Sequence, residues 1–115
     1  LENDESWEVR RNAAIALEMH ADNSSSKSLS SAISDLHWQV RKFSMRALTK
    51  VLSEEYLGEI VKLLCDDYSD VRKEAAIALG LLGSKKAIPS LKQSLDDADI
   101  EVRIQSQKAL EKLNV

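Results

Sequence analysis

The sequence predicts an all-α protein, a right-handed superhelical α-solenoid of about seven helices stacked as antiparallel pairs. Three observations carry this prediction. The chain repeats itself at a fixed period of 31 residues, the apolar residues of each copy recur with helical spacing, and no strand pattern or glycine-rich phosphate loop appears. A period of this length is typical of proteins in which each helix pair stacks on the next.

The repeated segment occurs four times without a gap. It reads EVRRNAAIAL from Glu8, QVRKFSMRAL from Gln39, DVRKEAAIAL from Asp70 and EVRIQSQKAL from Glu101. An aspartate five residues before the valine, the Val-Arg pair and a later Ala-Leu pair are identical in every copy. Such strict identity indicates one structural unit repeated along the chain.

The apolar positions of each copy predict a helix. In the first copy, one helix face collects Val9, Ala13, Ala16, Leu17 and His20. We expect the valine of each copy to lie in the core. His20 occupies the position that Val51, Leu82 and Leu113 occupy in the other copies, which we call a column of the repeat. We therefore expect it to be buried or packed at the edge of the core. The aspartate before each helix suits an N-cap or a first-turn acid.

A second, shorter helix is predicted in the rest of each period. The segments EEYLGEIVKLLC and KKAIPSLKQSL each place apolar residues on one stripe, and Pro89 suits the first turn of its helix. The equivalent segment SSKSLSSAIS is rich in serine, which weakens helices, so we expect a short or frayed helix there. Gly83 suits the end of the preceding long helix. Cys65 ends an apolar run, and we expect a buried thiol.

Each period should therefore form a helix hairpin, and the chain one domain, 1–115, made of a half repeat 1–22 and full repeats 23–53, 54–84 and 85–115. The first copy has only its second helix, and the chain opens in the middle of the pattern. We therefore expect a fragment of a longer repeat protein.

The pattern Asp-x4-Val-Arg-x2-Ala-x2-Ala-Leu resembles the HEAT repeat, and is most similar to its short form in phycobilisome lyase-like proteins. The segment from Asp66 to Leu91 is the best match. The resemblance implies an armadillo-like superhelix with a ladder of ion pairs between neighbouring repeats. The ladder would comprise Asp4, Arg10, Asp35, Arg41, Asp66, Arg72, Asp97 and Arg103. Copies two and four depart from the pattern with Ser44, Met45, Ser106 and Gln107.

The ladder arginines are interpreted as structural residues. On the helix wheel each arginine lies at the edge of the core, where a guanidinium can bridge carboxylates and cap loop carbonyls of the next repeat. Direct contact of these arginines with a ligand is the alternative.

An α-solenoid offers an extended concave surface, lined by the second helix of each pair. The candidate binding residues opposite the core are Trp7, Arg11, Ile15, Trp38, Lys42, Arg46, Lys73 and Ile77. Met19 and Phe43 lie at the rim. Tryptophan and arginine are frequent binding hot spots, so a basic and aromatic strip predicts a partly apolar, acidic protein or peptide partner. The alternative is that the tryptophans pack over the inter-helix loops and the cations form a solvated face.

Composition limits the other functions. Sixteen Lys and Arg against nineteen Asp and Glu give a net charge of −3, which provides no general attraction to nucleic acid or anionic lipid. No apolar run approaches the ~20 residues of a membrane span. One cysteine and two histidines at no metal-ligand spacing, with acidic pairs that suit helix capping, predict no enzyme, no catalytic residue, no cofactor and no metal. We expect a cytoplasmic protein.

Three functions remain. The first is a protein-interaction scaffold or adaptor that binds its partner on the concave face. The second is nucleic-acid binding on the same strip, against which the pI of about 5.4 argues. The third, suggested only by the resemblance, is a phycobilin lyase-like or other enzyme-accessory role. Uncapped apolar ends would also allow end-to-end self-association.

Overall fold

The computed structural model describes residues 6–20, 22 and 25–114, and every regular element in these ranges is helical. The α-helices there are α1 (Trp7–His20), α2 (Ser26–Ala32), α3 (Trp38–Leu48), α4 (Leu57–Lys62), α5 (Ser69–Leu82), α6 (Ile88–Ser94) and α7 (Ile100–Lys112). Three short 3₁₀ segments flank α4 and precede α6: η2 (Glu54–Tyr56), η3 (Leu63–Cys65) and η4 (Lys85–Ala87). The prediction of an all-α fold with alternating long and short helices is confirmed.

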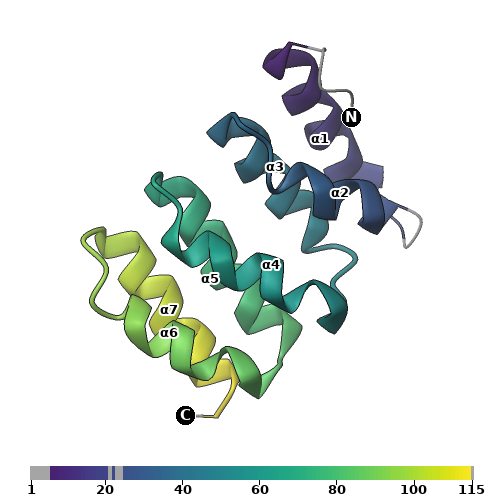
Figure 1. The fold of residues 1–115 in the computed structure, drawn as a ribbon. Helices are drawn as coiled ribbons and strands as arrows, with labels where there is room; N and C mark the ends of the chain where they lie inside the picture. The colour runs from purple at the N-terminus through teal and green to yellow at the C-terminus, as the bar shows by residue number, and fades with distance from the viewer. Residues whose placement is uncertain (1–5, 21, 23–24, 115) are drawn as a thin grey trace. The chain divides into compact units, whose positions relative to one another are not determined.

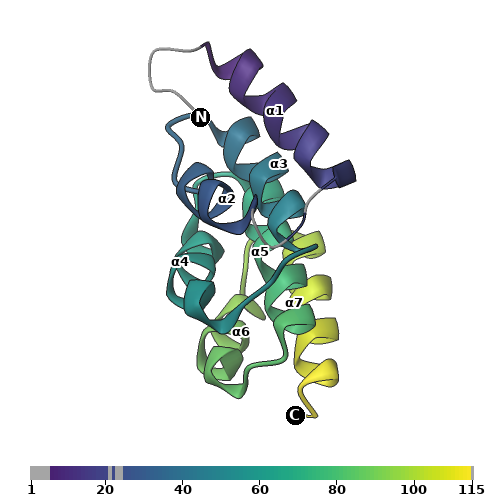
Figure 2. The same cartoon turned by 90° about the vertical axis from the view of Figure 1, so that its right-hand side faces the viewer.

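The chain forms two compact units, Leu1–Leu52 and Ser53–Val115. Unit 1 contains α1, α2 and α3, and unit 2 contains α4 to α7 (Figure 1). The long helices lie side by side within each unit, α1 against α3 and α5 against α7. In unit 2 the short helices α4 and α6 form a second layer against the long pair (Figure 2). Each unit therefore buries its apolar side chains between stacked helices.

The valine column forms the core in three of the four copies. Val40, Val71 and Val102 are fully buried, as predicted, whereas 52% of the Val9 surface is exposed. The prediction is wrong for the first copy because no described helix precedes α1 to cover this side of it. His20 is exposed for the same reason, so the prediction that it is buried is also wrong.

The ladder aspartates lie in the loops before the long helices. In each described copy the Oδ1 atom accepts a hydrogen bond at 2.8–2.9 Å from the backbone N–H two residues later. That later residue is the N-cap: His37, Tyr68 or Asp99. The prediction that the aspartate itself caps the helix or sits in its first turn is therefore wrong, because the aspartate closes the turn that leads into the cap. Asp4 lies outside the described residues.

Local signals at the helix ends are confirmed. Gly83 ends α5 in the left-handed region with φ 78°, where a Cβ would be strained. Pro89 lies at the start of α6, where the helix needs no N–H from it. The serine-rich α2 has only seven residues, and its N-cap Ser25 makes no side-chain capping bond.

The thiol of Cys65 is exposed, contrary to the prediction. Leu63 and Leu64 are buried, but this end of the apolar run forms the 3₁₀ segment η3. Ile60, Leu63 and Leu64 follow the i, i+3, i+4 spacing of one buried face, and Cys65, the next residue, falls off that face.

A glycine allows α5 and α7 to lie close together. A Cβ atom on Gly80 would lie 2.9 Å from the Cα atom of Ala109 and 3.0 Å from its Cβ atom. Both distances are shorter than ordinary contacts. Only glycine at this position allows the two helices their present separation.

Candidate functional site

The eight candidate binding residues are divided between the two units. Trp7, Arg11 and Ile15 lie on α1, while Trp38, Lys42 and Arg46 lie on α3. We call these six residues of unit 1 the α1–α3 face. Lys73 and Ile77 lie on α5 in unit 2. All eight side chains are half-buried.

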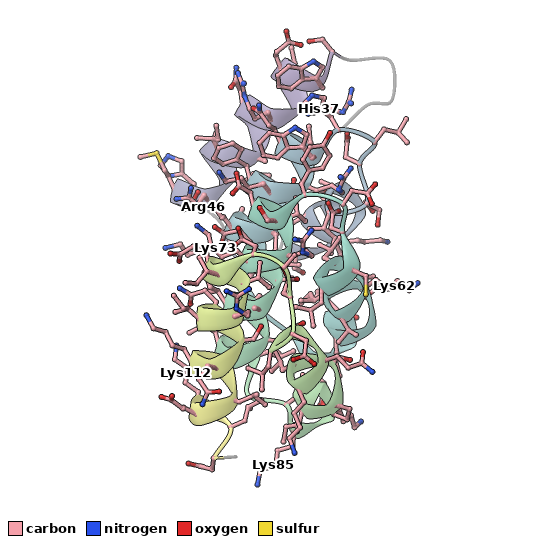
Figure 3. The ribbon with its side chains drawn as sticks, turned by 90° about the vertical axis from the view of Figure 1, so that its left-hand side faces the viewer. His37, Arg46, Lys62, Lys73, Lys85 and Lys112 are labelled. Carbon is pink, nitrogen blue, oxygen red and sulfur yellow. The ribbon has the colours of Figure 1, made fainter. Side chains whose placement is uncertain are left out.

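An aromatic stack lies where α1 and α3 begin. The rings of Trp7 and His37 are parallel, with an interplanar angle of 2° and centroids 3.8 Å apart. His37, which Figure 3 labels, is the N-cap of α3. Its Nδ1 atom accepts a hydrogen bond from the backbone N–H of Gln39 at 3.2 Å. Trp7 therefore packs over the loop before α3. For this residue, the structure agrees with the alternative in which the tryptophans pack over the inter-helix loops.

His37 was missed as a member of this cluster. Its ring also lies near Trp38, with centroids 6.4 Å apart and an interplanar angle of 17°. Its position in the sequence could have indicated its role, because it lies two residues after the ladder aspartate. In the described copies the residue at this position is the N-cap.

Arg11 packs against this cluster. Its Cζ atom lies 5.1 Å from the centroid of the Trp7 ring, and its Nη1 atom donates a hydrogen bond of 3.2 Å to Oε1 of Gln39. Cation–π attraction and this hydrogen bond together restrict the guanidinium. Arg11 is therefore held in place before any partner arrives.

A second aromatic ring with cations lies further along α3. Lys42 Nζ and Arg46 Cζ lie 5.3 Å and 5.6 Å from the centroid of the Phe43 ring. Arg46 Nη2 also forms an ion pair of 3.3 Å with Oε2 of Glu18 on α1. Phe43, expected at the rim, contacts both of these cations, and we include it in the α1–α3 face from here on.

The charged residues of α3 are all positive. Between its first and last residues this helix carries Arg41, Lys42 and Arg46 and no carboxylate. Unit 1 has seven Lys and Arg and seven Asp and Glu in its sequence, so the net charge of −3 belongs to unit 2. Helix α3 therefore supplies positive charge to a unit that is neutral overall.

The structure brings two pairs of ladder residues together, one in each unit. Arg10 Nε and Nη2 donate to the Asp35 carboxylate at 2.6 and 3.1 Å, and Arg72 does the same to Asp97 at 2.9 and 3.1 Å. These are bidentate, charge-assisted contacts between consecutive repeats. Because Arg41 and Asp66 belong to different units, a ladder along the whole chain stays a prediction.

Three of the ladder arginines cap loop carbonyls of their own repeat. The Nη1 atom of Arg41 donates a hydrogen bond to the Asp35 carbonyl at 2.8 Å. The Nη1 atoms of Arg72 and Arg103 donate in the same way to the carbonyls of Asp66 and Asp97, at 2.8 and 2.7 Å. The prediction that the capped carbonyl belongs to the next repeat is wrong. The helix turn that carries the arginine faces the loop just before it.

These contacts change the acidity of the aspartates. Burial of the Asp97 carboxyl favours its neutral form, but the hydrogen bond from Arg72 and the backbone N–H of Asp99 outweigh burial and lower its pKa. Burial also favours the neutral form of the Asp35 carboxyl. The hydrogen bonds from the Arg10 side chain and the His37 backbone N–H outweigh it, so the pKa of Asp35 is lowered as well. The pKa of Arg72 is raised, chiefly by its hydrogen bond to Asp97.

Residues suited to metal binding or membrane insertion are not grouped in the described ranges. No cluster of three or more His, Cys, Asp or Glu side chains occurs there that could hold a metal ion. No helix in the same ranges has the length and apolar character needed to cross a membrane.

Helix pairs stacked at a constant period define an α-solenoid. A family model for HEAT repeats matches residues 26–111, and the chain belongs to the HEAT-repeat family. The resemblance inferred from the Asp…Val-Arg pattern is thereby confirmed. HEAT repeats generally serve as protein-interaction scaffolds and are typically not enzymes.

A solved structure with the same fold supports this assignment. The crystal structure of an engineered protein from the Northeast Structural Genomics Consortium superposes with a TM-score of 0.72 and 24% sequence identity. The superposition covers 96% of this chain and 58% of that one, so this chain spans less than two thirds of its length. At this identity the likeness shows the fold alone. No curated protein matches the chain.

Proposed function

We propose that this protein is a non-enzymatic scaffold or adaptor that binds an acidic, partly apolar segment of another protein on the α1–α3 face. One observation carries the proposal: two aromatic rings on this face, Trp7 and Phe43, each lie against cations held within 6 Å. Aromatic rings with fixed cations offer a partner both apolar contact and charge.

The arrangement suits a partner with carboxylates beside apolar side chains. Lys42 and Arg46 are four residues apart, so their charged groups lie on one side of α3 one turn apart. A partner carboxylate that reaches Arg46 would compete with Glu18, its present ion-pair partner. Binding of this kind depends on salt, because rim charges act mainly on the association rate.

Lys73 and Ile77 occupy the equivalent columns on α5. We extend the proposal to them as binding residues of unit 2 in their own right. The cytoplasm is the proposed compartment, because the thiol of Cys65 is exposed and exposed thiols persist where the environment is reducing.

Charge reversal on the face tests the proposal. Lys42→Glu should weaken the binding of partners captured from the native source by about tenfold, because it places repulsion where attraction steers the partner. Lys62→Glu, on the exposed surface of α4, is the matched control and should bind as the unchanged protein does. Partners are identified by affinity purification with mass spectrometry, and their affinities are then measured with purified components.

Circular dichroism must show equal helicity for both variants. Equal affinities of the Lys42 and Lys62 variants for every partner would refute the proposal. An anisotropy titration with single-stranded oligonucleotide at about 50 mM salt separates it from nucleic-acid binding. Saturable oligonucleotide binding that Lys42→Glu abolishes would favour the nucleic-acid alternative instead.

A further inference from the structure

We infer that Arg11 is an oxyanion subsite of the α1–α3 face, where its guanidinium takes a carboxylate or phosphate group of the partner. This deepens the proposed function, on which it rests, by assigning one residue to the anionic group of the partner. Three features of unit 1 support it: the neutral partners of Arg11, the sequence position of Gln39, and the separate ion pair of Arg46.

Within the described ranges, Arg11 is held by neutral groups alone. Its Nε and Nη2 atoms each donate a hydrogen bond of 3.3 Å to Oδ1 of Asn12, and its Nη1 atom donates one of 3.2 Å to Oε1 of Gln39. Its Cζ atom lies 5.1 Å from the centroid of the Trp7 ring. The guanidinium is therefore fixed in position by contacts that leave its charge without an ion pair.

Other guanidinium groups of the protein are neutralised by the chain itself. Arg10, Arg46 and Arg72 each form an ion pair with a carboxylate of a neighbouring repeat, at N–O distances of 2.6, 3.3 and 2.9 Å. Arg11 lies on the same helix as Arg10, yet no carboxylate in the described part of the chain forms an ion pair with it. An anion from outside the chain would supply the missing negative charge.

Gln39 is the residue that leaves Arg11 without a carboxylate. It occupies the position directly before the valine, which is Glu8, Asp70 and Glu101 in the other three copies. A carboxylate at this position would meet the Nη1 atom that Gln39 now meets, and the ion pair would satisfy Arg11 within the chain. The neutral amide instead orients the guanidinium and keeps its charge for another group.

The guanidinium of Arg11 retains N–H groups for such an anion. Arginine carries five N–H donors, and Asn12 and Gln39 accept from three of them. Asn12 is exposed, and its hydrogen bonds with Arg11 lie at the surface, so an incoming oxyanion can reach this side. The oxygens of a carboxylate or phosphate accept short, charge-assisted hydrogen bonds from donors of this kind. Because the side chain is already ordered, its binding loses little conformational entropy.

Arg46 is a separate site on the same face. Gln39 and Arg46 are seven residues apart on α3, which is about 10 Å along the helix axis. Figure 3 likewise shows Arg46 apart from His37, which lies at the start of this helix. The carboxylate of Glu18 already binds Arg46. An anion at Arg46 must displace Glu18, whereas an anion at Arg11 displaces no charged group, so Arg11 is the favoured subsite.

Small anions used as probes test the inference without the partner. The Nε–H signal of Arg11 in ¹H–¹⁵N NMR should shift saturably as sodium phosphate or sodium acetate is added at constant ionic strength. The signal of Arg46 should respond only at higher concentration, because Glu18 competes there. Tighter binding of phosphate would assign the subsite to a phosphorylated segment, and equal or tighter binding of acetate would assign it to aspartate or glutamate.

Gln39→Glu is the decisive variant. The new carboxylate should pair with Arg11 and weaken phosphate binding there by about tenfold or more, while circular dichroism shows an unchanged fold. Gln93→Glu, on the exposed surface of α6, adds the same charge elsewhere and should bind phosphate as the unchanged protein does. Glu18→Gln should raise the affinity at Arg46 and leave that at Arg11 unchanged.

Three results would overturn the inference: an Arg11 signal that shifts with neither anion, an Arg46 signal that saturates first, or unchanged phosphate binding in folded Gln39→Glu. If Gln39→Glu does not fold, Arg11→Gln replaces it, and calorimetric binding of phosphate must then be lost. The partner test is independent of these results. Weakened partner binding by Lys42→Glu with an unresponsive Arg11 would refute the subsite alone, and a responsive Arg11 with no effect of Lys42→Glu would refute the partner proposal alone.

Discussion

Arg72 serves two neighbouring repeats at once. One nitrogen of Arg72 caps a loop carbonyl of its own repeat, and two others bind a carboxylate of the next. A lysine could not replace it, because a single ammonium group cannot present a planar fork and a separate donor with fixed geometry. A double use of this kind favours arginine over lysine at this position of the repeat.

Replacement of Arg72 by alanine should lower the free energy of unfolding by about 1–3 kcal/mol, because Asp97 loses its charge-assisted bonds. Urea unfolding followed by circular dichroism measures the loss. Arg103→Ala is the control. It removes the carbonyl bond but no carboxylate bond within the described residues, so it should cost less. An equal cost for both variants would show that the bond to Asp97 contributes nothing.

The pH dependence of stability has a defined sign. The pKa of Asp97 is lower in the folded state than in the unfolded chain. Its contribution is therefore present above the unfolded value of about 4 and is lost as the pH falls through the lower folded value. The difference between the unchanged protein and Arg72→Ala should accordingly shrink in acid. A difference that stays constant from neutral pH to about pH 2 would contradict this account.

Two glycines provide a matched pair of predictions. Gly80→Ala should lower stability by about 1–3 kcal/mol, since the new Cβ would lie 2.9 Å from the Ala109 Cα and the backbone there cannot turn aside. Gly58→Ala on α4 should instead raise stability by about 0.5–1 kcal/mol, because nothing lies within 4 Å and alanine favours helix. Thermal unfolding of both variants measures the signs. A gain at Gly80 would show that α5 and α7 separate freely.

At the scale of elements, residues at equivalent positions of the four copies differ in burial, because different neighbours pack beside their helices. The valine column is buried in α3, α5 and α7 but exposed in α1, the helix that no described helix precedes. The apolar face of a helix predicts where a partner is needed, not whether a partner is present. The errors at Val9 and His20 have this single cause.

The start of α3 offers a test of how a helix is fixed to its neighbour. His37→Ala should lower the free energy of unfolding by about 1 kcal/mol for the lost cap, and by about 0.5–1.5 kcal/mol more for the lost stack on Trp7. His37→Asn keeps a capping oxygen and should lose only the stack. Urea unfolding, with tryptophan fluorescence as a second probe, distinguishes the two. Equal losses for both variants would mean that the capping bond has no measurable value.

At the scale of the whole molecule, the repeat period predicted the fold because each copy contains the residues that form and end its own helices. Helix spacing, Pro89 and Gly83 act within a few residues, so their structural meaning is readable along the sequence. The candidate site was less accessible to such reasoning. The stack of Trp7 on His37 joins residues 30 positions apart, and its geometry depends on the packing of α1 against α3.

The sequence by itself determined the all-α class, the HEAT-repeat family, the alternation of long and short helices, and the recurrence of arginine and aspartate at fixed positions of each copy. These features follow from local preferences repeated at a constant period. Only the tertiary structure decided which copy of a column is buried, which carbonyl each arginine caps, and where Trp7 lies. Burial and side-chain partners depend on which surfaces meet, and the 31-residue pattern is the same whether a neighbouring helix is present or not.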